Sequence, residues 1–91
     1  MDSALKDGYI MVVEDDKLLL EAINEKLTKE NMPHKCFLEG TEAMKALIDN
    51  AERPSLIWLD FYLGDTNGLS LVKIIKDNSE LSKIPVLVVS N

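Results

Sequence analysis

Carboxylate side chains follow two strongly apolar segments of this chain, at the point where each segment ends. The run Ile10–Val13 leads into Glu14 and Asp15, and the run Leu56–Leu59 leads into Asp60. Runs this apolar are typical of strands buried on both faces of a parallel sheet. Because neighbouring parallel strands lie about 5 Å apart and share one direction, the residues that end them gather at one edge of the sheet. The sequence therefore predicts that these three carboxylates lie close together.

Carboxylates at this spacing repel one another. At about 5 Å and an effective dielectric near 20, each ionised pair costs roughly 3 kcal/mol. Such a cluster either retains a proton or binds a cation, and a hard divalent ion is the natural occupant of an all-oxygen pocket. A third apolar run, Ile84–Val89, ends in Ser90, whose hydroxyl is expected at the same edge. The predicted centre is therefore a cation site with a hydroxyl beside it.

The elements that must position these side chains alternate along the chain. Strands are predicted at Tyr9–Val13, His34–Leu38, Ser55–Leu59 and Ile84–Val89. Helices are predicted from the N-cap Asp16 to near Asn31, from the turn and N-cap Gly40–Thr41 to Arg53–Pro54, and from just after Gly68 to Asn78–Ser79. This order predicts an α/β fold with right-handed crossovers, in which helices cover both faces of a parallel sheet.

Apolar residues recur at helical spacing in each predicted helix and indicate which face packs inward. These residues are Leu19, Ile23 and Leu27 in the first helix, Ala43, Met44, Leu47 and Ile48 in the second, and Leu71, Ile74 and Ile75 in the third. Trp58 lies two residues before Asp60 on the same predicted strand, so it should point to the same face and pack beneath the site. Its fluorescence should then respond to a group bound there.

Composition excludes several classes of function. The chain has 91 residues, 46% hydrophobic and 29% charged, which fits one small globular domain. Its net charge is −6 and its ten basic residues are scattered, so we expect no nucleic acid partner. The apolar stretches are too short to cross a bilayer, so no membrane association is expected. Residues 1–8 form a polar, flexible leader without the apolar core of a secretory signal, which predicts a cytoplasmic location.

Two other reactive side chains favour structural roles. Cys36 is the only cysteine, so it forms no internal disulfide and has no partner at zinc-ligand spacing. His34 is the only histidine and has no nucleophile near it in sequence. We therefore interpret both as structural residues, Cys36 as a small core hydrophobe.

Three segments, taken in order, carry a family resemblance. They are Val12–Asp16, then Leu59–Asp60 with Gly68 eight residues on, then Pro85–Ser90. Together they resemble the signature segments of the receiver domain of two-component response regulators, over essentially all of residues 9–91. The resemblance implies a flavodoxin-like sheet with strand order 2-1-3-4.

The resemblance also implies a role for each site residue. Glu14 and Asp15 would hold Mg²⁺, Asp15 directly and Glu14 through water, and Asp60 would be the phosphoacceptor that also contacts the metal. The main-chain carbonyl of Tyr62 would complete the protein's share of the metal ligands. Ser90 would bond a phosphoryl oxygen and swing inward on activation. The implied function is a phosphorelay receiver that accepts a phosphoryl group from a histidine kinase or phosphotransfer protein.

The sequence departs from the family in two respects. Complete receivers have a fifth strand and two further helices after the position of Ser90, so residues 9–91 are interpreted as a receiver truncated after the fourth strand. The family's lysine, which ends that fifth strand and pairs with the phosphoryl group, has no counterpart here, which predicts impaired phosphorylation. Gly64 stands where the family usually has proline, which predicts a more mobile loop after Asp60.

Alternative functions remain open at this point. The fourth strand would be an apolar sheet edge, so the chain could be a non-catalytic assembly module that pairs as a homodimer through Val86–Val89. Enzymatic activity would at most be self-phosphorylation and self-dephosphorylation rather than that of a classical enzyme. A phosphohydrolase is disfavoured because Tyr62 occupies the position of its second acid, and no glycine-rich dinucleotide fingerprint follows the first strand.

Overall fold

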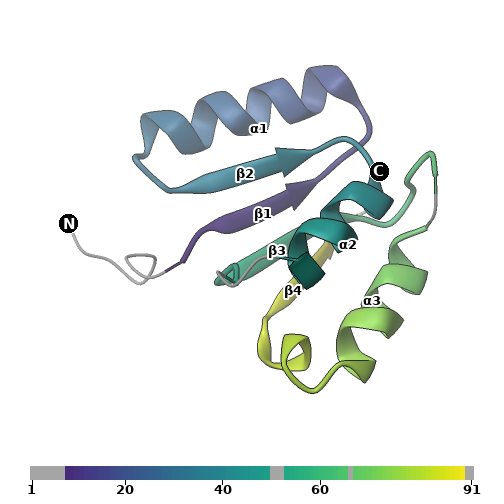
Figure 1. The fold of residues 1–91 in the computed structure, drawn as a ribbon. Helices are drawn as coiled ribbons and strands as arrows, with labels where there is room; N and C mark the ends of the chain where they lie inside the picture. The colour runs from purple at the N-terminus through teal and green to yellow at the C-terminus, as the bar shows by residue number, and fades with distance from the viewer. Residues whose placement is uncertain (1–7, 50–52, 66, 90–91) are drawn as a thin grey trace.

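The computed structural model describes residues 8–49, 53–65 and 67–89, and its strands and helices alternate along the chain as predicted (Figure 1). The strands are β1 Ile10–Val13, β2 His34–Phe37, β3 Leu56–Asp60 and β4 Val86–Val89. The helices are α1 Lys17–Lys29, α2 Gly40–Asp49 and α3 Gly68–Asp77, with a short 3₁₀ helix η1 at Leu81–Lys83 that was not predicted. Apart from Gly8, the predicted leader 1–8 lies outside the described residues.

The sheet has the order β2-β1-β3-β4, and every pair of neighbouring strands is parallel. This confirms the flavodoxin-like order that the resemblance implied. Val13 pairs with Leu59, and Asp60 pairs with Val89. The carboxyl ends of β1, β3 and β4 therefore lie at one level, and the loops that follow β1 and β3 begin at that edge of the sheet (Figure 1).

The main core lies between the sheet and the two helices α2 and α3. Its best-buried members come from both layers and include Met11, Val13, Ile57, Leu59, Leu47, Leu71, Ile75 and Leu81. The prediction that Ile48 and Ile74 face inward is wrong, because Ile48 is 61% exposed and Ile74 is 49% exposed. Each lies at the margin of its helix's apolar face, beyond the stripe that contacts the sheet.

The opposite face of the sheet is less well covered. No residue of α1 is fully buried, although Leu19, Ile23 and Leu27 are half-buried as predicted for an inward stripe. The prediction that the fourth strand is buried on both faces is wrong, because Leu87 is 47% exposed and Val88 is 43% exposed. Within the described residues, β4 is an edge strand with a neighbour on one side only.

Local side chains begin two of the helices. Asp16 has an extended backbone and its Oδ1 accepts a hydrogen bond of 3.2 Å from the Leu19 amide, which confirms it as the N-cap of α1. Asn67 does the same for α3, with 2.8 Å from its Oδ1 to the Ser70 amide. Among the helices of the described ranges, none is long and apolar enough to cross a membrane.

Helix α2 begins in a different way from the one predicted. The sequence suggested that Gly40–Thr41 supplies a turn and an N-cap, but both residues lie inside the first turn of the helix. Their amides instead donate to the carboxylate of Asp65, which lies in the loop between β3 and α3. The cap therefore comes from a segment that is distant in sequence.

Candidate metal centre

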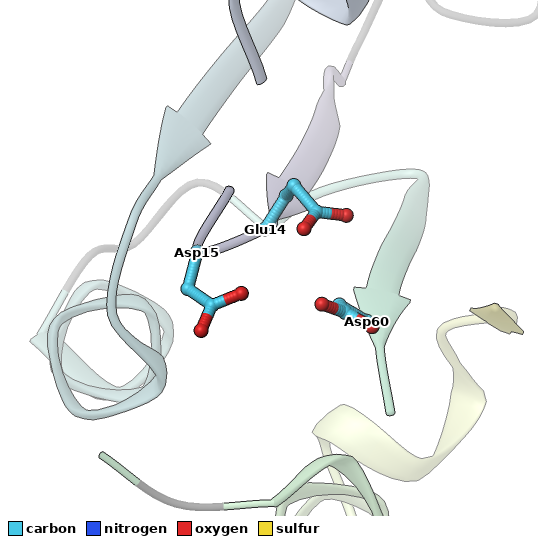
Figure 2. Close-up of side chains that lie close together, drawn as sticks. All are labelled: Glu14, Asp15 and Asp60. Carbon is cyan, nitrogen blue, oxygen red and sulfur yellow. The ribbon is translucent and has the colours of Figure 1, made fainter. Parts of the chain in front are cut away.

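Three carboxylates meet at the carboxyl edge of the sheet. Glu14 and Asp15 follow the end of β1, Asp60 ends β3, and their side chains converge on one space (Figure 2). One carboxylate oxygen from each residue lies within 4.8 Å of the corresponding oxygens of the other two. The strand register produces this arrangement, because Val13 and Leu59 are paired and the acids follow them at the same level.

Glu14 is the most buried of the three, with 1% of its surface exposed. Its Oε2 accepts from the Asp16 amide at 3.2 Å, whereas its Oε1 has no hydrogen-bond partner among the described residues. Burial raises the pKa of Glu14 to about 7; the Asp16 amide opposes this, and the nearby carboxyls of Asp60 and Asp15 raise it further. A buried anion without a second partner is costly, so this oxygen favours either a proton or a cation.

Asp60 is 4% exposed, and the loop that follows it folds back closely. Its Oδ1 accepts from the Tyr62 amide at 3.2 Å, and the Gly68 amide donates to the Phe61 carbonyl at 2.6 Å. A Cβ atom at Gly68 would lie 2.7 Å from the main-chain oxygen of Asp60, which is closer than real Cβ contacts. Glycine is required there because backbone occupies the space, and this contact fixes where the loop returns.

Asp15 forms the exposed side of the cluster. Its Oδ2 would lie 3.4 Å from a Cβ atom placed on Gly64, so the loop after β3 passes directly beside it. An exposed carboxylate can rotate at little cost, which suits a direct metal ligand, whereas the buried Glu14 is held by its surroundings. The cluster therefore has two buried carboxylates, Glu14 and Asp60, and one exposed carboxylate, Asp15, that can rotate.

The geometry fits a small hard cation. Mg²⁺ takes oxygen ligands at about 2.1 Å in octahedral geometry, so ligands on opposite sides of the ion lie roughly 4 Å apart. The carboxylate oxygens lie within 4.8 Å of one another, which is slightly more than this ligand-to-ligand distance. A bridging water or a small rotation of the Asp15 side chain would bring the two distances into agreement. The partnerless Oε1 of Glu14 provides a further acceptor for such a water.

The remaining predicted site residues are less fully defined by the structure. Tyr62 is 63% exposed and its ring contacts Phe61 edge-to-face at 4.7 Å between centroids. Ser90 lies outside the described residues, although its neighbour Val89 pairs with Asp60 and the Val89 carbonyl accepts from the Phe61 amide. Trp58 is half-buried, and its indole nitrogen has no hydrogen-bond partner in the described part of the chain.

Residues 10–91 match the family model of the response regulator receiver domain. This chain belongs to that family. As a receiver, it is 33% identical to response regulator Rcp1 of Synechocystis over 98% of its own length and 65% of that protein. It is 31% identical to the polar-differentiation response regulator DivK of Brucella anthropi, over 89% of this chain and 64% of that protein.

A longer relative matches over a smaller fraction of its length. The DNA-binding transcriptional regulator NtrC of Proteus hauseri is 31% identical over 94% of this chain but only 17% of that protein. The receiver chain thus spans less than two thirds of each of these three relatives.

Solved receiver structures share the fold. The phosphorylated cyanobacterial phytochrome response regulator RcpA superposes with a TM-score of 0.82 at 36% identity, over 91% of this chain and 64% of that chain. The bacteriophytochrome response regulator AtBRR superposes with a TM-score of 0.82 at 25% identity, over 94% of this chain and 68% of that chain. These matches agree with the strand order of the receiver sheet.

Proposed function

We propose that this receiver accepts a phosphoryl group on Asp60, with Mg²⁺ held by Glu14, Asp15, Asp60 and the main-chain carbonyl of Tyr62. The observation that carries the proposal is the convergence of three carboxylates, two of them almost fully buried, at the edge where β1 and β3 end. Buried carboxylates with a purely structural role are usually fully hydrogen-bonded, whereas Glu14 has one oxygen without a hydrogen-bond partner among the described residues. A cation accounts for that arrangement.

The proposed reaction is a transfer between two nucleophiles. An oxygen of Asp60 attacks phosphorus, the bond between phosphorus and the donor's imidazole nitrogen breaks, and that nitrogen keeps the electron pair. The product is an acyl phosphate on Asp60. The Tyr62 amide, 3.2 Å from Oδ1, orients the carboxylate so that the second oxygen remains available. When bound, Mg²⁺ would neutralise the repulsion between the carboxylate and the phosphoryl oxygens.

The proposed partners follow from this chemistry. The donor is a histidine kinase or a phosphotransfer protein that presents a phosphorylated imidazole. Ser90 is proposed as the hydroxyl that bonds the transferred group, since Val89, its neighbour, pairs with Asp60. The cytoplasmic location and the absence of a nucleic acid partner stay predictions from the sequence.

Intact-mass measurement tests the phosphoacceptor. The chain is incubated with a small phosphodonor and Mg²⁺, and it should gain the mass of one phosphoryl group. Hydroxylamine, which cleaves acyl phosphates and spares phosphoesters, should remove that mass. Asp60→Asn should abolish the gain, whereas Asp49→Asn, the same charge change at the exposed end of α2, should not. No gain on the wild-type chain would refute phosphoacceptor activity.

One observation favours a second candidate, a non-catalytic assembly module. The edge strand β4 carries Leu87 and Val88, which are 47% and 43% exposed on opposite faces of the sheet. Within the described residues, no strand pairs with the outer backbone groups of β4, and such an edge with apolar side chains is a template for pairing with a second copy. In this alternative the receiver forms a homodimer through β4 without metal or phosphorylation.

Sedimentation at several concentrations distinguishes the two candidates. A dimer that persists in EDTA and is lost in Leu87→Lys supports assembly through β4. Leu18→Lys is the matched control, because Leu18 is 78% exposed on α1, away from the sheet edge. A monomer at all concentrations, with or without Mg²⁺, would exclude the assembly module.

A further inference from the structure

Asp65 ties the loop after the phosphoacceptor to a different element of the fold. Its Oδ1 accepts from the Gly40 amide at 3.0 Å, and its Oδ2 accepts from the Thr41 amide at 3.0 Å and the Thr41 hydroxyl at 2.7 Å. These three bonds, here called the Asp65 clamp, satisfy amides that a helix cannot satisfy itself in its first turn. They join positions 24 and 25 residues apart in sequence.

The clamp acts on the segment that carries the metal site. The loop is closed at its base by the bridge between Tyr62 and Asn67, and Leu63 is anchored in the core. Gly64, immediately before Asp65, passes beside the Oδ2 of Asp15. The position of Gly64 beside Asp15, and of the Tyr62 carbonyl at the base of the loop, therefore depends on where Asp65 is held.

Asp65 supplies a constraint that Gly64 does not. Gly64 has no positive φ and no Cβ, so its own backbone restricts the loop little. The pKa of Asp65 is lowered, first by the Thr41 amide and then by the Thr41 hydroxyl, so the clamp is made by the charged carboxylate. Both carboxylate oxygens are directed to α2, which distinguishes Asp65 from the three acids that converge on the cation site.

We infer that Asp65 is a positioning residue that couples the start of α2 to occupancy of the metal site. This inference rests on the proposed function, because it requires that Mg²⁺ binds Glu14, Asp15 and Asp60. Coupling of this kind is reciprocal: if the clamp improves Mg²⁺ affinity by some factor, bound Mg²⁺ favours the closed clamp by the same factor. Helix α2 would thereby sense the metal without contacting it.

Magnesium titration of clamp variants tests the inference. Binding is followed by calorimetry and by the fluorescence of Trp58, the only tryptophan. Asp65→Ala should weaken Mg²⁺ binding about fivefold, at the low end of the usual range for coupled sites. Thr41→Val removes the hydrogen bond from the Thr41 hydroxyl to Asp65 and should weaken Mg²⁺ binding less than Asp65→Ala does. Thr41→Ser keeps a hydroxyl and should bind Mg²⁺ as the wild-type chain does. Asn78→Ala is the stability control, because Asn78 Oδ1 accepts from the Glu80 and Leu81 amides, far in sequence from the site.

Amide exchange supplies a readout that a purely structural role would not change. In the wild-type chain, Mg²⁺ should slow exchange at the Gly40 and Thr41 amides by about the factor that Asp65→Ala costs in affinity. Unchanged Mg²⁺ affinity in both Asp65→Ala and Asp65→Asn, with stability reduced as in Asn78→Ala, would overturn the inference and leave the proposed metal site standing. Absence of Mg²⁺ binding in the wild-type chain would overturn both.

Discussion

Replacing Glu14 with glutamine should make the metal-free receiver more stable at alkaline pH. The carboxyl of Glu14 is 1% exposed, and burial, together with the neighbouring carboxyls of Asp60 and Asp15, raises its pKa from 4.5 to about 7. The unfolded chain loses this proton near pH 4.5 and the folded chain near pH 7. The folded state therefore binds more protons in between, and the free energy of unfolding falls as pH rises through that window.

The size of the effect follows from the shift. At about 1.4 kcal/mol per pKa unit, moving from 4.5 to about 7 corresponds to about 3 kcal/mol. This contribution is fully present below pH 4.5 and is lost once the pH exceeds about 7. Glu14→Gln has no proton to lose there, so its stability relative to wild type should increase across the same window and reach a gain of about 3 kcal/mol.

Denaturant unfolding in EDTA between about pH 4 and pH 8 measures this difference. Comparing the variant with wild type at each pH removes the contribution of groups that titrate equally in both chains. Asp65 is one of these groups, and its lowered pKa makes the free energy of unfolding decrease as the pH falls in the acid range. Glu21→Gln, an exposed glutamate of α1, is the matched control and should leave the profile unchanged. Saturating Mg²⁺ should stabilise wild type at alkaline pH more than Glu14→Gln.

A stability difference between Glu14→Gln and wild type that does not vary with pH would refute this reasoning. A variant that is less stable than wild type above pH 7 in EDTA would refute it more directly, because it would mean that the carboxylate of Glu14 is well stabilised without a cation.

Four further substitutions test how the loop after Asp60 and helix α3 are held in place. Gly68→Ala should destabilise the receiver by about 1–3 kcal/mol, because its Cβ would lie 2.7 Å from the main-chain oxygen of Asp60; an unchanged denaturation midpoint would contradict this. Gly64→Ala should stabilise by about 0.4–1 kcal/mol, since its Cβ meets nothing closer than 3.4 Å and its φ is not positive; a lower midpoint would contradict this. Ile75→Ala, at 2% exposure, should cost about 2–5 kcal/mol of unfolding free energy, and Ile74→Ala, at 49% exposure, should cost far less; equal losses would contradict the assigned packing.

The sequence predicts this fold well where a local pattern carries the information. Apolar runs followed by polar residues identify the strands, and the pattern at Asp16 identifies the cap of α1. The inward positions Leu71 and Ile75 are also correct. Ile74 fails because spacing of three and four residues selects a broad stripe and does not say how much of it the sheet covers.

Features that depend on distant segments could not be predicted. The cap of α2 comes from Asp65, and no local motif links that loop residue to Gly40 and Thr41. The exposure of Val88 depends on which elements pack against the face of the sheet to which its side chain points, and the apolar run alone does not specify them. The position of the three site carboxylates was predictable, because parallel pairing alone brings the ends of β1 and β3 together.

A cation site would explain why the receiver has an acidic cluster that lowers the stability of its metal-free fold. Burying Glu14 beside Asp60 raises the pKa of Glu14 and leaves one of its oxygens without a partner among the described residues. An apolar residue at position 14 would avoid both costs. Sequences usually agree with their fold at every level except where a site requires otherwise. The local pattern is broken at Glu14 and Asp60, which are the buried charged residues of the described ranges. The same carboxylates that weaken the metal-free fold are those that a cation would stabilise, so metal binding and folding should reinforce each other.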